Sequence, residues 1–190
     1  MDVFEALRTR RDIGKLKAET PPRDFIEKIL EAGTWAPNHH LTQPWRFFVL
    51  TGEALNRLGE ARAQALMEEL DDPDSATSSA RLDKERIAPL RAPVMIAVAI
   101  SPSDNPIVEE VEEIEAVAMA VQNMLLAAHA LGLGAMLRTG KAAYRKKVKE
   151  FFGVTGKERL FGFIHLGYPD MAPPERTRSS FAEKTKWLQS

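Results

Sequence analysis

The stretch APNHHLTQPWRFFVL, residues 36–50, joins a loop to a strand. Pro37 and the adjacent histidines His39 and His40 favour a loop in its first part. The second part, from Trp45 to Leu50, is aromatic and β-branched, which is typical of a buried strand. Loops held by a rigid scaffold often carry binding residues. We therefore expect this polar, imidazole-bearing loop to face a bound ligand.

Composition narrows the class of protein. The chain has 190 residues, 44% of them hydrophobic, which suits one domain with its own core or one subunit whose core continues into a partner. Its 26 basic and 27 acidic residues nearly cancel, so charge gives no reason to expect nucleic acid or a membrane as a partner. The absence of cysteine excludes disulfides and thiolate chemistry. The start, MDVFEALRTRRD, is unlike a signal peptide, and no apolar run reaches the ~20 residues of a membrane span. We expect a cytoplasmic protein.

Periodicity and breaker residues divide the chain into alternating elements. Helices are expected over residues 2–11, 20–33, 53–70, 81–90, 109–131 and 141–152, and strands over 45–50, 94–100, 135–137 and 160–166. Asp2 and Glu5 form a capping box, Thr20 is the expected N-cap of the second helix, and Gly33 is its expected C-terminal cap. The acidic, Ser-rich residues 71–80 predict a mobile surface loop. These elements indicate a layered domain of the α/β type.

The longest expected helix, residues 109–131, is apolar almost all round from Ile114 onward. A helix with this pattern has to be buried on every side. In a chain of this size, packing against a twin helix in a homodimer is one way to achieve that, and the alanines permit close approach. Gln122, Asn123 and His129 interrupt the pattern and need polar partners; for Asn123 an interface role is favoured over a catalytic one.

Motifs for a nucleophile, a metal or nucleotide hydrolysis are missing. Gly132-Leu133-Gly134 starts like a dinucleotide fingerprint but follows a helix instead of a strand, and in GVTGK at 153–157 the glycines are too close for a phosphate loop. The four histidines lack a spaced carboxylate cluster. What remains is a set of arginines, an imidazole loop and a Thr-Gly turn. Such a set suits an anionic cofactor that brings its own chemistry.

Several of these residues also have simple structural interpretations. Arginines at the end of the first helix suit the helix dipole, and from the residues alone this interpretation is favoured over an anion-binding turn. His39 could equally cap the end of the second helix. Trp35 and Trp45 are more often core residues than cofactor contacts. His129 and His165 are expected to be structural.

Five segments occur in one order along the chain: RRD at 10–12, APNHHLTQPWRF at 36–47, the helix and strand at 115–140, IHLGYP at 164–169, and RTR at 176–178. Together they resemble the FMN-dependent nitroreductase family, and most of all its small single-domain NAD(P)H nitroreductases. The resemblance implies an α+β, nitroreductase-like three-layer fold. Its central mixed, mostly antiparallel sheet of four to five strands would be flanked by helices, in an intertwined homodimer. One domain would span residues 1–190, with 71–90 as a mobile loop or lid and 170–190 as an extension docking on the partner subunit.

The resemblance also implies a set of site residues. The arginines of the RRD segment would contact the flavin phosphate or ribityl oxygens, residues 137–139 would follow the pyrimidine edge, and the C-terminal arginines would complete the phosphate clamp. The cofactor-binding set is Arg10, Arg11, Asp12, Trp35, His39, Leu137, Arg138, Thr139, Gly140, Arg176 and Arg178. Trp35 and His39 would come from the other subunit of a dimer. Nicotinamide contacts would lie at Ala127, Ala128, His129, Ala130, Leu131 and Gly132.

Three positions depart from the family pattern. Asp12 stands in place of the usual serine, Gly14 in place of a third basic residue, and Leu41 in place of an asparagine found in larger members. An ionised Asp12 would repel a phosphate unless Arg10 or Arg11 neutralises it. These departures concern the details of phosphate binding more than FMN binding itself.

The implied reaction passes electrons from NAD(P)H through FMN to a nitroaromatic, a quinone or a similar small acceptor, by a ping-pong mechanism. The chemistry belongs to FMN, so no catalytic side chain and no metal are expected, and Arg138 is the candidate for a stabilising positive field. Two alternatives stay open. One is another flavin reaction on the same fold, either reductive dehalogenation or oxygen-dependent flavin cleavage. The other is a non-enzymatic flavin-binding, redox-sensing dimer. The choice between NADH and NADPH is also open, because no arginine can be singled out for a 2′-phosphate.

Overall fold

A four-stranded sheet forms the centre of the chain in a computed structural model that describes residues 1–188. Its strands are β1 (Trp45–Thr51), β2 (Val94–Ile100), β3 (Gly134–Arg138) and β4 (Arg159–Gly167), in the order β1-β2-β4-β3. Every neighbouring pair is antiparallel, and an isolated parallel bridge joins Asp12 to Ala135 at the β3 edge. The predicted class, a mostly antiparallel sheet between helices, is confirmed.

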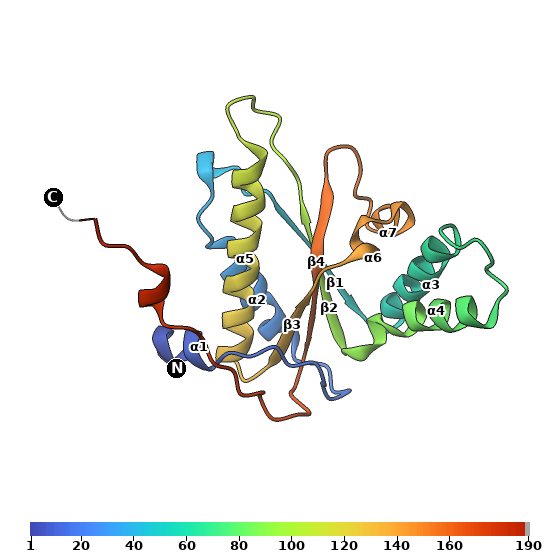
Figure 1. The fold of residues 1–190 in the computed structure, drawn as a ribbon, viewed down its shortest axis with the longest axis horizontal. Coiled ribbons are helices and arrows are strands. Elements are labelled where there is room, and N and C mark those ends of the chain that lie inside the picture. Colours follow the sequence, from blue (N-terminus) through green and yellow to red (C-terminus); the bar gives the residue numbers. More distant parts are fainter. Residues whose placement is uncertain (189–190) are drawn as a thin grey trace.

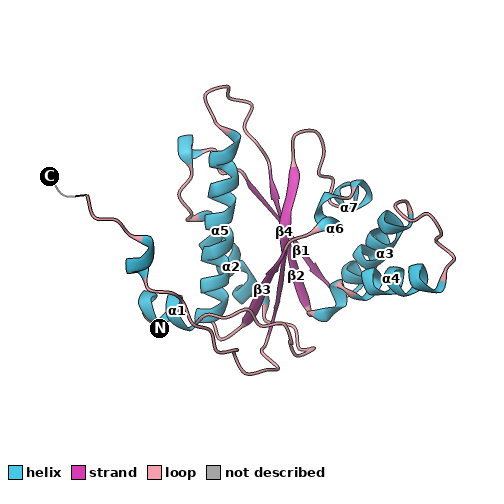
Figure 2. Ribbon diagram, viewed as in Figure 1, coloured by secondary structure: helices cyan, strands magenta, loops and turns pink. Residues whose placement is uncertain are grey.

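Helices cover both faces of this sheet, which gives three layers (Figures 1 and 2). Helices α2 (Arg23–Thr34) and α5 (Glu110–Ala130) pack on one face, and α3 (Glu53–Met67) packs on the other. Side chains alternate along a strand, so Ile96 and Val98 of β2 enter different layers from Met95 and Ala97. All seven residues of β2 are buried, as its continuous apolar sequence predicted.

The remaining helices are shorter or lie outside the layers. They are α1 (Val3–Thr9), α4 (Ala76–Ile87), α6 (Lys141–Tyr144) and α7 (Lys146–Phe151), with 3₁₀ turns at His39–Leu41, Pro89–Arg91 and Phe181–Lys184. In Figure 1, α3 and α4 project together on the side of the sheet away from α5. Leu66 and Leu82 hold that pair together. No helix within residues 1–188 has the length and apolar character needed to cross a bilayer.

Helix α2 differs from the prediction at both ends. Pro22 is its N-cap and makes no side-chain capping bond, so Thr20 does not cap it. The helix also continues through Gly33 and ends at Thr34. A Cβ atom on Gly33 would lie 2.9 Å from the Met124 Cγ atom of α5. The glycine is therefore needed for the close approach of α2 to α5, and its predicted role as a C-terminal cap is wrong.

Other bounds also differ from the predictions; α1 ends at Thr9 and α3 at Met67. The predicted loop at 71–80 is shorter, because the Ser75 hydroxyl accepts a hydrogen bond from the Ser78 amide (3.3 Å) and α4 begins at Ala76. The single helix predicted over 141–152 is two helices, α6 and α7, because Arg145 is extended (φ −70°, ψ 135°). That break turns the Arg145 side chain into the interior, where it meets two carboxylates.

Helix α5 keeps an exposed stripe that contains both apolar and polar residues. Val111, Ala118, Met119 and Gln122 are exposed, although Ala116 and the other inward residues are buried. The composition of α5 requires burial on every side, and a single chain does not provide it. The homodimer remains a prediction, and this stripe is the surface it would cover.

Candidate functional site

An arginine-lined cavity of about 390 Å³ lies where the N-terminal and C-terminal segments meet the edge of β3. Its lining residues are Arg10, Arg11, Asp12, Gly14, Met136, Met171, Pro174, Arg176 and Arg178. Four guanidinium groups thus face one carboxylate, which leaves the cavity strongly positive. Guanidinium groups bind phosphate through charge-assisted hydrogen bonds. Residues from the two ends of the sequence, predicted to act together, are brought together here; we call this space the arginine cavity.

The charged groups of the arginine cavity have different partners. The Arg10 Nη1 atom lies 3.2 Å from the Asp12 Oδ1 atom, so Arg10 balances the Asp12 carboxylate. Arg11 donates to three backbone carbonyls, those of Arg8 (2.7 Å), Arg10 (2.8 Å) and Pro174 (3.2 Å). The Arg11 guanidinium therefore ties the C-terminal segment to the end of α1 and has less capacity left for a ligand than Arg10 has.

Close packing against β3 positions the RRD segment. The Ile13 amide donates to the Ala135 carbonyl (3.1 Å), next to the Asp12–Ala135 bridge. A Cβ atom on Gly134 would lie 2.8 Å from Ile13 Cγ2, so only glycine permits this approach. Further along the strand, Met136 lines the arginine cavity and Arg138 lines a second one. A ligand lying along this edge of β3 would reach both cavities.

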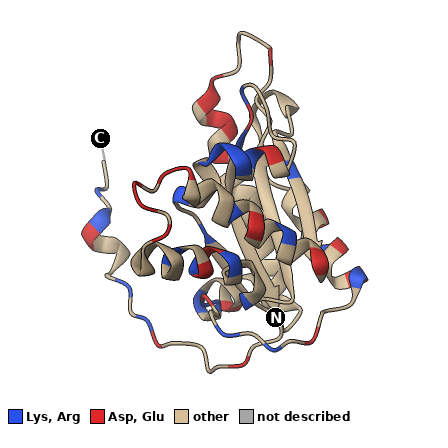
Figure 3. Cartoon of the chain, turned by 90° about the vertical axis from the view of Figure 1, so that its right-hand side faces the viewer, with Lys and Arg blue, Asp and Glu red and all other residues tan. Residues whose placement is uncertain are grey.

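The second space, which we call the cationic cavity, has a volume of about 510 Å³ and lies between the sheet, α4 and the start of α6. Its lining residues are Arg62, Leu66, Arg81, Lys84, Glu85, Ala88, Arg91, Arg138, Thr139, Gly140, Lys141, Ala142, Arg145, Phe163 and His165. The distribution of basic and acidic positions over α3 and α4 can be followed in Figure 3. Burial, together with the positive charges of Arg138, Arg62 and Arg91, lowers the pKa of His165 to about 4. His165 is thus a neutral part of the floor near pH 7.

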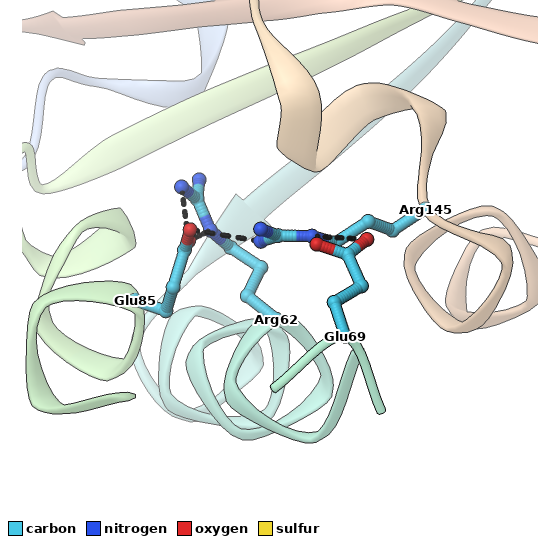
Figure 4. Close-up of polar contacts among 4 residues, drawn as sticks. All are labelled: Arg62, Glu69, Glu85 and Arg145. Atoms are coloured by element: carbon cyan, nitrogen blue, oxygen red, sulfur yellow. Dashed lines mark hydrogen bonds and ion pairs between the residues drawn. The ribbon is translucent and has the colours of Figure 1, made fainter. Parts of the chain in front are cut away.

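An ionic network that is buried except at Glu69 contributes to one wall of the cationic cavity (Figure 4). Arg145 donates to Glu69 (Nε to Oε1, 3.0 Å) and to Glu85 (Nη1 to Oε1, 2.8 Å). Arg62 of α3 meets the other oxygen of Glu85 at 2.7 Å. The network joins α3 and α4 to the junction of α6 and α7, and so holds α4 at a set position over the sheet. Sequence reasoning missed it, because nothing in the local pattern pairs residues 62, 85 and 145.

Trp35 and His39 are not brought to the arginine cavity within one chain. The His39 Nδ1 atom lies 2.7 Å from Glu112 Oε2, in the first turn of α5, whereas Thr9, beside Arg10, contacts His129 in its last turn. Glu112 and His129 are therefore separated by about 25 Å at ~1.5 Å per helical residue. Trp35 is 79% exposed, so its expected core position is wrong; Trp45 is buried as expected. His39 contacts α5 instead of capping α2.

Residues 127–132 form the last turn of α5 and the turn that follows. Gly132 has φ +77°, and the Leu133 amide donates to the Ala128 carbonyl (2.9 Å), an ordinary way to end a helix. Burial lowers the pKa of His129, and the nearby positive charges of Arg10 and Arg11 lower it further against the opposing effect of Glu5. His129 and Gly132 also line a cavity of about 310 Å³ next to Arg10. The nicotinamide role of this segment stays a prediction.

Comparison with known proteins gives a consistent result. Residues 7–168 match the model of the Nitroreductase family. The chain is 35% identical over 171 residues to YdjA of Escherichia coli K12, provisionally named an NAD(P)H nitroreductase, with 90% of each chain covered. A nitroreductase-like family protein from Bacillus cereus superposes with a TM-score of 0.85 at 25% identity, covering 100% and 97% of the two chains. A provisionally named nitroreductase from Desulfovibrio desulfuricans, solved in complex with FMN, gives 0.73 at 26% identity, covering 100% and 98%.

Proposed function

The chain belongs to the Nitroreductase family, and we propose that it carries electrons from NAD(P)H to a nitroaromatic, a quinone or a similar small acceptor by a ping-pong mechanism. It is an oxidoreductase of the nitroreductase type, with FMN as cofactor and NAD(P)H as co-substrate. The acceptor, the order of the steps and the assignment of site residues are the proposal. The observation that carries the residue assignment is the arginine cavity beside β3.

The residues of the arginine cavity fit a phosphate. Arg10, Arg176 and Arg178 line it with guanidinium groups, and none of the three is bonded to a distant part of the described chain. We assign these residues to the FMN phosphate. Arg11 we assign to holding the C-terminal segment in place, because the carbonyls of Arg8, Arg10 and Pro174 already accept its N–H groups.

Residues 137–140 would line the ring of the cofactor. Arg138 is the residue whose position is most informative, because its Nε atom is buried without a hydrogen-bond partner in residues 1–188. A buried donor without an acceptor is unfavourable in the free protein, so this atom marks a place where a ligand is expected. When bound, FMN accepts a hydride from the nicotinamide and returns electrons to the acceptor. Arg138 would supply a positive charge close to the flavin, which favours its anionic reduced form.

A homodimer would complete this site. In a twofold pair with antiparallel α5 helices, the first turn of one α5 lies near the last turn of the other. The exposed stripe of α5 would be covered, and Trp35 and His39 of each chain would approach the arginine cavity of its partner. Their separation from Arg10 within one chain is then a consequence of a shared site.

The position of the Asp12 carboxylate leads to a prediction about FMN affinity. Asp12→Asn is expected to tighten FMN binding roughly three- to tenfold, because it removes a negative charge from the arginine cavity and releases Arg10 from its 3.2 Å ion pair. Titration of the apoprotein with FMN, followed by flavin fluorescence, measures the change. Weaker binding in Asp12→Asn would mean that the carboxylate is needed to hold Arg10 in its binding position.

The proposed reaction is tested by turnover. FMN-loaded protein is expected to oxidise NADH or NADPH in the presence of a nitroaromatic or a quinone, with parallel lines in double-reciprocal plots, since one site serves both substrates in turn. Intersecting lines would contradict the ping-pong order. FMN binding without any NAD(P)H oxidation would contradict the oxidoreductase and favour a flavin-binding sensor.

A further inference from the structure

The cationic cavity has more positive charge than its own carboxylates can balance. Arg62 and Arg145 are neutralised by Glu85 and Glu69. The other basic lining residues form no ion pair within residues 1–188; they are Arg81, Lys84, Arg91, Arg138 and Lys141. Arg81 and Lys84 lie on α4, and elsewhere on this helix Arg86 pairs with both Glu60 and Asp83. The unbalanced charge thus belongs to the cavity and is not a general property of α4.

The floor of the cavity indicates a ligand as well. Arg138, whose charge we assign to the flavin, also lines this cavity and has a buried Nε donor without an acceptor in the described chain, so the cavity adjoins the proposed flavin position. Phe163 supplies an apolar surface beneath Arg138, with the Arg62 guanidinium 5.9 Å from the ring centre. An apolar floor with one converging donor and charges at the rim is the usual composition of a small-molecule site. The volume of about 510 Å³ also lies in the range of such sites.

We propose that the cationic cavity binds a carboxylate or phosphate group of the substrate that exchanges electrons with the flavin. This inference rests on the proposed function, which places the cofactor along β3. The FMN phosphate does not need this cavity, because the arginine cavity has its own cations at the other end of the strand. Two kinds of substrate carry such a group: an acceptor with a carboxylate, and NADPH with its 2′-phosphate. Neutral quinones and NADH lack it.

The test uses FMN-loaded protein and the double variant Arg81→Gln/Lys84→Gln, in which α4 loses two exposed cations of the rim. Arg57→Gln is the matched control, because Arg57 is an exposed cation on the neighbouring helix α3, has no ion-pair partner within residues 1–188 and lies outside the cavity. Two substrate pairs of similar shape are compared by kcat/KM: 4-nitrobenzoate against 4-nitrobenzamide, and NADPH against NADH. The Kd values of benzoate and of 2′-AMP, measured by perturbation of the flavin absorbance, give a readout that is independent of turnover.

In one of the two substrate pairs, the ratio of kcat/KM for the anionic member to kcat/KM for the neutral member is expected to fall roughly tenfold in the double variant. This estimate assumes that each exposed cation contributes a few-fold. The matching Kd should rise by a similar factor, and values for the neutral members should stay within twofold. A change in the nitrobenzoate pair identifies an acidic acceptor, and a change in the NADPH pair identifies the 2′-phosphate; either supports the site. Unchanged ratios for both pairs, or an equal change in Arg57→Gln, would overturn it. FMN binding with turnover of 4-nitrobenzamide would leave the proposed function standing in that case.

Discussion

Replacing Arg10 and Arg178 together by alanine is expected to weaken FMN binding roughly 100- to 1,000-fold. Both guanidinium groups line the arginine cavity, one from each end of the chain. A charge-assisted hydrogen bond contributes about 1.5–3 kcal/mol, so the loss of two corresponds to about 3–6 kcal/mol. The expected weakening lies in the lower part of this range, because Arg178 is exposed and Arg10 is partly exposed to solvent. Within residues 1–188 these side chains have local partners only, Asp12 for Arg10 and the Thr177 carbonyl for Arg178. The fold should therefore survive the double substitution.

Fluorescence titration of the apoprotein with FMN measures this effect. Arg8→Ala is the control, because Arg8 is an exposed arginine in the last turn of α1 that does not line the arginine cavity. Its FMN affinity should remain within about twofold of the original, as expected for a screened surface charge. An unchanged affinity in the double variant would show that the phosphate is bound elsewhere, and the residue assignment would then be wrong.

The second large effect concerns stability. Arg145→Ala is expected to lower the free energy of unfolding by about 3 kcal/mol, the lower end of the range for breaking a buried ion pair. Glu85 loses one of its two guanidinium partners and keeps Arg62. The Arg145 side chain is only 7% exposed, and Glu85, one of its two partners, is 20% exposed (Figure 4). In a chain of this length the melting temperature should fall by roughly 6–12 °C. Thermal unfolding, followed by circular dichroism, measures the difference.

The control for Arg145→Ala is Arg86→Ala. Arg86 also has two acidic partners, Glu60 and Asp83, but these pairs are exposed at the surface of α4. Exposed pairs contribute about 1 kcal/mol or less, so this variant should melt within a few degrees of the original protein. Equal losses in both variants would contradict the importance of the buried network.

The same network predicts a pH dependence. Burial raises the pKa of Glu85, but the bonds and charges of Arg145 and Arg62 outweigh it and hold the pKa below its ordinary value of 4.5. A carboxyl group whose pKa is lowered on folding stabilises the protein fully above its unfolded pKa and loses that contribution as pH falls through the folded pKa. The stability difference between the original protein and Arg145→Ala should therefore be constant near pH 7 and shrink at pH values below 4.5. A difference that persists in acid would mean that packing, not charge, is lost.

The sequence predicted the architecture correctly where a pattern was compatible with one type of element only. The run VMIAVAI is buried at every position as β2, and the apolar helix over 109–131 became α5 with nearly the same bounds. Predictions failed where a tertiary contact overrode the local signal. Gly33 looked like a cap but is required by the approach of Met124. The predicted helix over 141–152 is broken at Arg145, where the extended backbone lets the side chain reach two distant carboxylates.

In the candidate site, too, one part was predicted and another was not. RRD and RTR were predicted to act together, and they do lie in one cavity. The cationic cavity was not predicted, because its cations come from separate elements and only the fold assembles them. The spacing of Arg81 and Lys84, three residues apart on one helix, was the one local signal available. Trp35 and His39 do not line the arginine cavity of their own chain, and His39 contacts Glu112 at the far end of α5.

The central claim is that this chain is a flavin-dependent oxidoreductase, and an anaerobic reduction tests it most directly. The purified protein, loaded with FMN, is titrated with NADH or NADPH in the absence of an acceptor, and its visible spectrum is recorded. We predict that the flavin absorbance bleaches with one equivalent of nicotinamide per FMN, and returns when a quinone or nitroaromatic is added. A spectrum that stays oxidised with both nicotinamides would contradict the claim.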